Sequence, residues 1–406
     1  MNLKGRSREG LVRSRFERVG CNGAAESRAH GNSNPSMNVQ WLRGSIDRKN
    51  NFDLIRLFAA VQVVIYHGVR HMGVPIPDVL RSILASFPGV PIFFFLSGML
   101  VTFSLSMTPD RRKFYEKRLR RIYPGLLFAF VLAIIMLVGF HQVTSAELGR
   151  PGFWAWVVGQ TTIVQFWNPP FFRDFATGVV NGSLWTISIE VSFYAILPFL
   201  AAWAAGKADA VDTAQARRRL SIITGIAVAL SYALYLYIES FGDDAPMRIK
   251  ILHQTFLPHL WLFGLGILAF LYFDRLREFV QGKVFLLLAL SLAANFTVQH
   301  FAFPGEFALS FVGTILLCLA TLAVAVATKP VAAQVLRGWD MSYGIYLYHM
   351  IAMNSFVALG WKGSWIHLLG VLGITACVAT FSWKFIEHPV MRGKRVDKPE
   401  AVAHVA

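Results

Sequence analysis

The chain of 406 residues is 55% hydrophobic and only 15% charged, and its mean hydropathy is +0.49. A soluble domain carries about 25% charged residues, so this composition excludes a soluble enzyme, a disordered protein and a small secreted domain. Lys and Arg total 39 against 23 acidic residues, and in so apolar a chain the net charge of +16 indicates membrane topology rather than a nucleic-acid partner. The three cysteines are far apart and form no disulfide or metal-ligand pattern, so we expect no metal site.

Residues 1–51 differ from the rest of the chain. They contain ten Lys or Arg, four acidic residues and no apolar run long enough for a signal peptide. This composition predicts a basic, disordered cytoplasmic tail, which could bind anionic lipid. A simple tether, or translation that begins at Met37, explains the segment equally well.

Apolar segments long enough to cross a bilayer follow one another after Asn51. A transmembrane helix needs about 20 mostly apolar residues. The segments that meet this requirement are 52–70, 84–106, 122–141, 183–203, 220–240, 251–273, 284–303, 306–327, 343–360 and 364–386. The expected fold class is therefore all-α, a polytopic membrane protein with about ten transmembrane helices.

The basic residues predict the orientation of these spans. If the short apolar stretch 153–167 does not cross, 30 of the 39 Lys and Arg lie on one side, in the tail, 107–121, 204–219, 274–283, 328–342 and 388–406. Because basic loops stay cytoplasmic, we expect both termini in the cytoplasm and 142–182 as an outer-face hairpin that dips into the bilayer. Residues 52–392 would form the membrane domain and 393–406 a cytoplasmic tail.

The first span carries charged and titratable side chains, which are functional candidates because inserting a charge costs about 2.5–3.5 kcal/mol. Asp53 and Arg56 lie near its inner end, and His67 and His71 near its outer end. At about 100° per residue, Arg56 and His67 lie within roughly 20° of each other on the helix face and about 16.5 Å apart along it. In the alternative interpretation, Arg56 reaches lipid headgroups and His67 only bonds a neighbouring helix.

The second span contains a pair of small residues, and the third begins with a pair of basic residues. Ser97-Gly98 is typical of close helix packing. The loop 111–121 is the densest basic stretch, and its simplest role is to fix topology. Yet Arg118 and Arg121 stand three apart on one helical face, where two guanidiniums suit phosphate groups.

Glu190 lies about a third of the way into the span that opens near Trp185. A carboxylate at that depth needs a partner or a watery cavity. The candidate partners are His67 and Arg56, because a charge-paired network is the least unfavourable way to bury such groups.

The last two spans also carry polar residues. Tyr343 and His349 open the ninth span, and hydrogen bonding between helices explains them as well as a functional role does. In the last span, Pro389 is expected to stop the helix just after Glu387, which would pack at the inner boundary.

Taken in order, these segments resemble the acyltransferase-3 family of bacterial membrane O-acyltransferases. The resemblance covers residues 51 to about 392 and rests on Asp53-x-x-Arg56 with ten residues before His67, Phe94-Phe95-Leu96-Ser97-Gly98, Arg118-x-x-Arg121, Leu184-Trp185-Thr186-Ile187-Ser188-Ile189-Glu190, Ser342-Tyr343-x-x-Tyr346-Leu347-x-His349 and Phe385-Ile386-Glu387-x-Pro389. Some relatives carry a periplasmic esterase-like domain at the C-terminus, and we expect the stand-alone form here.

The resemblance implies transfer of an acyl group, most often acetyl, from cytosolic acyl-CoA to a hydroxyl of an envelope, exported or lipid-linked carbohydrate. It implies a location in the bacterial inner membrane and no bound cofactor besides the acyl-CoA substrate. The family's first-helix arginine and histidine map to Arg56 and His67. Arg118 and Arg121 are implied to hold the CoA phosphates, with Ser97 also on the acyl-CoA side. The oligomeric state stays open.

Acyl transfer to a sugar hydroxyl needs a base, because the hydroxyl is a poor nucleophile until its proton begins to leave. His67 is the best candidate, since an imidazole titrates near pH 6.5. Glu190 or Asp53 would orient it, and Arg56 would stabilise the oxyanion. An acyl-enzyme on Ser97 or His67 is not required.

Two other functions compete with this hypothesis. A transporter or flippase could use the buried Arg, Glu and His as an ion path, although the sequence has no matching inverted halves. A membrane esterase working in reverse is disfavoured because the sequence has no GxSxG elbow.

Overall fold

The computed structural model describes residues 39–392, except for residues 43, 45, 48, 109, 163, 207–211 and 302–305. Most of the predicted N-terminal tail and all of 393–406 lie outside the described residues. The described part of that tail is packed: Trp41 and Leu42, in η1 (Gln40–Leu42), are buried, and η1 contacts α3 and α8. Among the described residues, packing therefore extends back to Val39, before the predicted boundary at residue 52.

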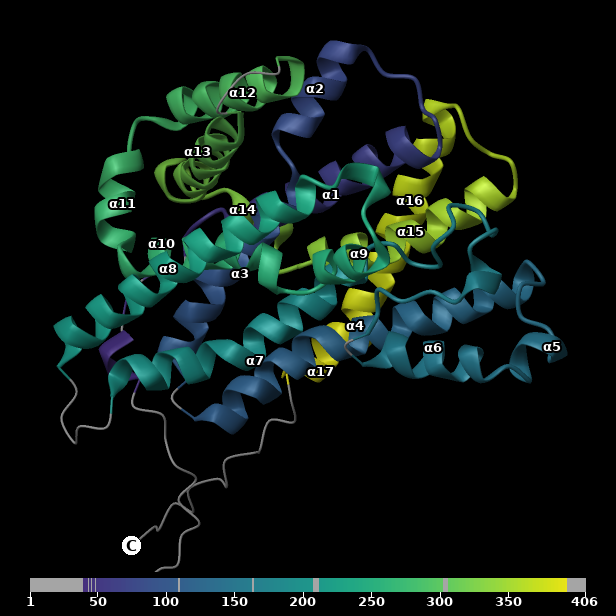
Figure 1. Cartoon of the computed structure of the whole chain (residues 1–406), viewed down its shortest axis with the longest axis horizontal. Coiled ribbons are helices and arrows are strands. Elements are labelled where there is room, and N and C mark those ends of the chain that lie inside the picture. The colour runs from purple at the N-terminus through teal and green to yellow at the C-terminus, as the bar shows by residue number, and fades with distance from the viewer. Residues whose placement is uncertain are drawn as a thin grey trace, which may run out of the picture. The chain divides into compact units, whose positions relative to one another are not determined.

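All regular structure among the described residues is helical, which confirms the all-α prediction (Figure 1). Seven helices or continuous helix pairs are long and apolar enough to cross a membrane. They are α1 (Phe52–His71), α2 with α3 (Asp78–Ser86 and Gly89–Ser106), α4 (Arg111–Gly139), α7 (Trp185–Ala205), α8 (Thr213–Glu239), α13 (Glu306–Ala327) and α16 through α17 (Trp365–Ser382 and His388–Arg392).

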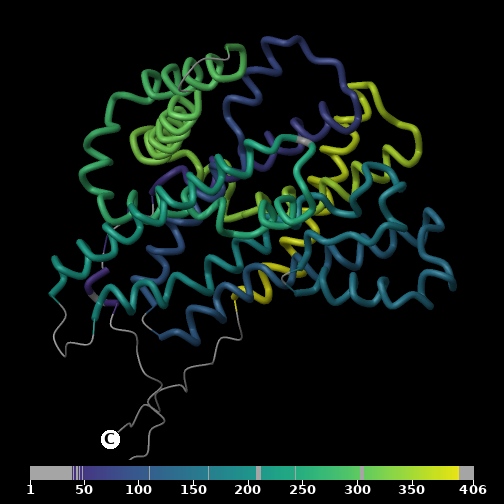
Figure 2. Tube along the Cα trace, viewed as in Figure 1, coloured from purple at the N-terminus to yellow at the C-terminus, as the bar shows by residue number. Residues whose placement is uncertain are grey.

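Two bent pairs raise the number of candidate spans to nine if each pair forms one span. They are α9 (Met247–His253) with α10 (Leu260–Leu271), bent by 51°, and α11 (Phe273–Val280) with α12 (Val284–His300), bent by 92°. Figure 2 shows the sharp turn of the chain between α11 and α12. The remaining expected span, 343–360, corresponds to α15 (Ser342–Ala358), a shorter helix of 17 residues. A count of ten spans and the orientation of the termini therefore stay predictions.

The segment between α4 and α7 contains two short helices, α5 (Ser145–Leu148) and α6 (Pro151–Thr161), and a turn of 3-10 helix, η2 (Pro170–Phe172). At 1.5 Å per residue, the 11 residues of α6 are about 16 Å long, roughly half of a 30 Å hydrocarbon core. This length fits the prediction that 153–167 does not cross the membrane. The helix packs against α4 instead (Figure 1).

The basic stretch 111–121 is helical, so its prediction as a loop is wrong. The side chain of Asp110 accepts a hydrogen bond from the Lys113 backbone N–H at 3.2 Å and caps the N-terminus of α4. Arg and Lys are good helix formers, so the capped run continues into the apolar part of the helix without a break. The basic side chains are therefore held by three turns of helix.

Glycine residues bring α3 and α10 into direct backbone contact. A Cβ atom on Gly98 would lie 2.2 Å from the carbonyl oxygen of Phe263, and one on Gly266 would lie 2.2 Å from that of Phe95. Both distances are far below van der Waals contact, so only glycine fits. The close packing predicted for Ser97-Gly98 is confirmed, and it fixes the position of Ser97 on α3.

Pro389 does not stop the last helix, as the sequence had suggested. A π-helical turn, η5 (Trp383–Glu387), joins α16 to α17, and Pro389 is the second residue of α17. Pro389 has no N–H for a regular i→i−4 bond, and the π-helical turn interrupts that bonding pattern immediately before it. The π turn buries Glu387, whose Oε1 accepts a hydrogen bond from Ser382 at 2.8 Å.

Candidate active site

A cavity of about 650 Å³ opens where α4 begins. Side chains from α1, α3, α4, α7, η5, α17, α15 and the segment before α15 line it. Its charged lining comprises six basic residues, Arg56, Lys113, Lys117, Arg118, Arg120 and Arg121, and three acidic ones, Glu116, Glu190 and Asp340. We call this space the basic cavity.

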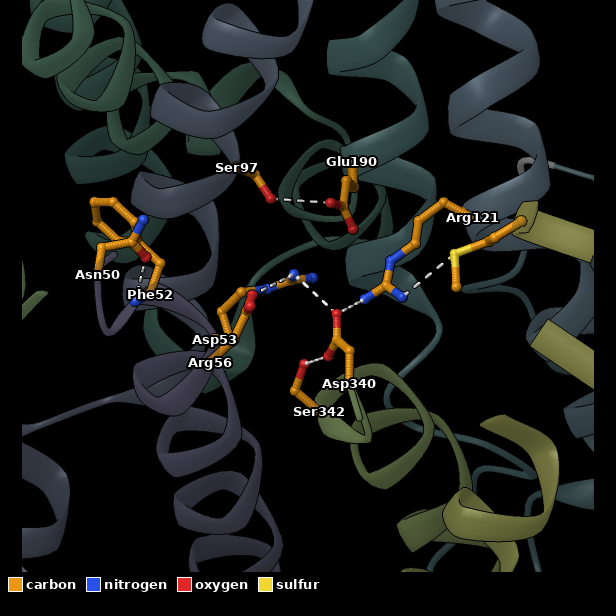
Figure 3. A network of polar contacts seen from close by, with 10 residues as sticks. Asn50, Phe52, Asp53, Arg56, Ser97, Arg121, Glu190, Asp340 and Ser342 are labelled. Carbon is orange, nitrogen blue, oxygen red and sulfur yellow. Dashed lines mark hydrogen bonds and ion pairs between the residues drawn. The ribbon is translucent and has the colours of Figure 1, made fainter. Parts of the chain in front are cut away.

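Asp340 joins two arginines in the lining of the basic cavity, and Figure 3 shows their contacts. Its Oδ2 accepts from Arg121 at 2.5 Å and from Arg56 at 3.4 Å, and its Oδ1 accepts from the Ser342 hydroxyl at 2.6 Å. Burial alone would raise the pKa of Asp340, but Arg121, Arg56 and the hydrogen bonds from Ser342 outweigh burial and hold that pKa well below its ordinary value. Asp340 is therefore a carboxylate at any physiological pH.

Arg121 is fixed on several sides. The Tyr343 and Trp383 rings lie 5.6 and 5.9 Å from its guanidinium carbon, which are cation–π distances. Tyr343 is itself held by a hydrogen bond of 2.8 Å from its hydroxyl to the Ile122 carbonyl. Arg121 thus has one defined orientation and a carboxylate partner.

Arg118 has neither a carboxylate partner nor a fully satisfied side chain within the described part of the chain. Its Nη2 donates to the Ser104 hydroxyl at 3.0 Å, and its guanidinium lies 5.7 Å from the Tyr194 ring. Its Nε is buried without a hydrogen bond. Lys113 and Lys117 likewise form no ion pair among the described residues, so the cavity holds more positive charge than its own carboxylates balance.

Glu190 faces the basic cavity but pairs with neither of its expected partners. The Ser97 hydroxyl donates to its Oε1 at 2.9 Å (Figure 3), and the Tyr194 hydroxyl donates to the same oxygen. Asp53 lies 4.0 Å from Arg56, with 61% of its side chain exposed. The structure therefore brings neither Glu190 nor Asp53 to His67.

His67 pairs with another histidine instead. Its Nδ1 lies 2.9 Å from Nε2 of His349 on α15, and Nδ1 of His349 lies 2.7 Å from the Tyr346 carbonyl oxygen. Arg56 and His67 both reach toward α15 and the segment before it, as expected for residues on one face of α1. However, Arg56 contacts Asp340, just before α15, and His67 contacts His349, near the middle of α15, so the two have separate partners.

A narrow space of about 40 Å³ continues from the basic cavity into the bundle. Arg56, Ser97, Glu190 and Tyr343 line both spaces, and Tyr346 lines only the narrow one. Tyr346 lies one turn before His349 on α15, but neither His349 nor His67 lines this space. Trp185 packs against Phe94, with ring centroids 6.4 Å apart, and lines neither space.

The most important residue that the sequence did not identify is Asp340. It stands in a segment predicted to be an ordinary cytoplasmic loop, and its partner Arg56 is 284 residues away along the chain. No spacing within one sequence links two such positions. Trp383 was missed for the same reason, whereas Tyr194 lies one helical turn after Glu190, a spacing that could have indicated the pair. No group of three His, Cys, Asp or Glu side chains in the described ranges has metal-binding geometry.

Comparisons with known proteins give a consistent result. A family model described as an acyltransferase domain matches residues 49–384. The chain is 32% identical over 369 residues to Nodulation protein 10 of Rhizobium leguminosarum bv. viciae, a match that covers 86% of this chain and 95% of that protein. It is 24% identical over 370 residues to the O-acetyltransferase OatA of Staphylococcus aureus, covering 84% of this chain but 57% of OatA.

A third relative is the O-acetyl transferase of Shigella phage Sf6, which is 22% identical over 340 residues, covering 84% of this chain and 95% of that protein. No solved structure matches the chain.

Proposed function

Because the chain belongs to this acyltransferase family, we propose that it transfers an acetyl group from cytosolic acetyl-CoA to a hydroxyl of an envelope, exported or lipid-linked carbohydrate. Family membership makes the chain an acyltransferase and favours an enzyme over a transporter or flippase. The relatives named for O-acetyl transfer support acetyl as the group transferred. We assign the activity to residues 52–392, in the bacterial inner membrane.

We choose acetyl-CoA as the donor because the basic cavity has positive charge that its own carboxylates do not balance. Arg118, Lys113 and Lys117 have no carboxylate partner among the described residues, and Arg118 keeps a buried N–H without an acceptor. Phosphate oxygens would satisfy these donors, because charge-assisted hydrogen bonds to guanidinium and ammonium groups are strong. The phosphates of CoA would therefore bind at the start of α4.

We take the narrow space next to the basic cavity as the path of the pantetheine arm of acetyl-CoA. The pantetheine arm would leave the phosphates at Arg118 and pass Ser97, Glu190 and Tyr343 toward Tyr346. The thioester would then lie near His67, which would accept the proton of the acceptor hydroxyl.

The structure changes the role that we propose for Arg56. Arg56 and His67 lie about 16.5 Å apart along α1, which argues against their meeting at one thioester carbonyl. Their partners also differ: Arg56 contacts Asp340, just before α15, and His67 contacts His349, near the middle of α15. We therefore place Arg56 with Arg121 and Asp340 in donor binding rather than in oxyanion stabilisation.

Labelled acetyl-CoA tests the proposal. Membranes that contain the wild-type chain are incubated with acetyl-labelled acetyl-CoA, and base-labile label is measured in the glycan and lipid-linked saccharide fractions. We expect label with the wild type and none with His67→Ala at equal membrane levels. No base-labile label in any fraction with the wild type would contradict the proposed donor or acceptor class. Full labelling with His67→Ala would remove His67 as the base.

A further inference from the structure

We propose that His349 is a positioning residue that fixes the tautomer of His67, so that Nε2 of His67 is the atom that accepts the proton. This inference rests on the proposed function, in which His67 is the general base. It follows from the hydrogen-bond chemistry of three groups in a row: the Tyr346 carbonyl, the His349 ring and the His67 ring.

The Tyr346 carbonyl determines the protonation of His349. A carbonyl oxygen can only accept, and it lies 2.7 Å from Nδ1 of His349, so that nitrogen must carry a hydrogen. A neutral imidazole has a single N–H, which leaves Nε2 of His349 as an acceptor. The hydrogen between the two rings therefore belongs to Nδ1 of His67, which lies 2.9 Å from Nε2 of His349.

This assignment holds for a neutral His349, and the surroundings of His349 favour that state. Its side chain is 0% exposed, and a buried cation without a carboxylate partner is strongly disfavoured. Its two ring nitrogens face a carbonyl and another imidazole, and neither of these is an anion. His349 therefore acts as a hydrogen-bond acceptor toward His67.

The other nitrogen of His67 is then the base. With its hydrogen on Nδ1, neutral His67 has a lone pair on Nε2, and no hydrogen bond within the described part of the chain occupies that atom. The His71 ring, with its centroid 5.5 Å away on the next turn of α1, packs against His67 without bonding to it. His67 is only partly buried, so its ring is not fully enclosed by the protein.

The transfer step balances with this arrangement. The acceptor O–H proton moves to Nε2 of His67 as the acceptor oxygen bonds to the thioester carbon. The C–S bond then breaks, and the proton passes from Nε2 to the departing CoA sulfur. While His67 is charged, its Nδ1–H still donates to Nε2 of His349, so the imidazolium is stabilised without a second proton transfer.

Two near-isosteric substitutions test the role of His349. In His349→Gln, the amide NH₂ can donate to the Tyr346 carbonyl and the amide oxygen can accept from Nδ1 of His67. In His349→Met, neither bond can form, although the side chain has almost the same shape. We expect His349→Gln to keep kcat within about tenfold of wild type and His349→Met to lower kcat about 100-fold or more, with KM for acetyl-CoA little changed in both.

Equal activity of His349→Gln and His349→Met, in samples with equal melting temperatures, would overturn the inference. Failure of the wild type to transfer acetyl from acetyl-CoA would instead overturn the proposed function.

A measurement that needs no activity checks the tautomer directly. In protein labelled with ¹⁵N-histidine and reconstituted in lipid, the signals lost in His67→Asn belong to His67. We expect them to have the shifts of an Nδ1–H, Nε2-unprotonated ring in the wild type. A ring protonated at Nε2 would refute the inference even if both His349 variants failed to fold.

Discussion

Arg56 and Arg121 bind the same carboxylate oxygen, Oδ2 of Asp340, from two different helices. Arg56 belongs to α1 and Arg121 to α4, whereas Asp340 stands just before α15. One carboxylate therefore links α1, α4 and the segment before α15 around the basic cavity. It also allows two guanidiniums to point into one space without repelling each other (Figure 3).

Asp340→Asn should destabilise the protein. The side chains of Asp340, Arg56 and Arg121 are 17%, 24% and 16% exposed, so the substitution leaves two largely buried guanidiniums without their anion. Removing one partner of a buried ion pair lowers the free energy of unfolding by about 3 kcal/mol. We expect a clearly lower melting temperature in detergent and a raised KM for acetyl-CoA.

Asp78→Asn is the matched control, because Asp78 is 96% exposed and only 4.0 Å from Arg81, a surface pair worth little. If Asp340→Asn and Asp78→Asn melted at the same temperature, Asp340 would not hold α1, α4 and the segment before α15 together.

The pH dependence of the Asp340→Asn effect has a defined sign. The pKa of Asp340 is lowered in the folded protein, so its contribution to stability is complete above its unfolded pKa of about 3.9. The contribution is lost only as the pH falls through the still lower folded pKa. The difference in melting temperature between wild type and Asp340→Asn should therefore be constant from pH 5 to 9. A difference that shrinks between pH 7 and 5 would show that another group controls it.

Arg118→Gln should weaken donor binding without affecting the chemical step. Arg118 has a buried Nε without an acceptor and no carboxylate partner among the described residues, so we assign it to CoA phosphate. Loss of one charge-assisted contact should raise KM for acetyl-CoA about tenfold and leave kcat nearly unchanged.

Arg112→Gln serves as the control for Arg118→Gln, since Arg112 is exposed and does not line the basic cavity. The KM of the wild type should also rise with salt concentration, and that of Arg118→Gln should rise less steeply. Equal KM values in the two variants would place the phosphates elsewhere.

The sequence predicted which face of α1 is functional but not what that face contacts. Helical periodicity puts Arg56 and His67 on one side, and both do contact α15 or the residues just before it. The partners Asp340 and His349 are more than 280 positions away along the chain, and their pairing depends on how the helices pack. The burial of Glu190 indicated that it has a partner. Helical periodicity does not show whether that partner is a charged residue of another helix or a hydroxyl, and the structure shows the hydroxyls of Ser97 and Tyr194.

The boundaries of the elements were predicted less well than their helical type. Hydropathy finds the apolar part of α4 but gives no sign that its helix begins at Arg111, because charged residues form helices without being apolar. The cap by Asp110 decides that boundary. Similarly, Pro389 is a helix-breaking signal in sequence, but the helix continues through it after the π turn at Trp383–Glu387.

Gly98→Ala should separate α3 from α10 and thereby disturb the site. The added methyl would lie 2.2 Å from the Phe263 carbonyl oxygen, so one of the two backbones must move. Overpacking of this kind costs about 1–3 kcal/mol, and here it also shifts Ser97, which donates to Glu190. We expect a lower melting temperature and reduced acetyl transfer.

The matched control for Gly98→Ala is Gly225→Ala in α8, where a Cβ would meet no atom within 4 Å and alanine favours the helix by up to about 1 kcal/mol. Gly225→Ala should therefore melt at or slightly above the wild-type temperature. If Gly98→Ala behaved in the same way, the α3–α10 contact would be looser than the structure has it. Ser97 would then have no fixed position from which to orient Glu190.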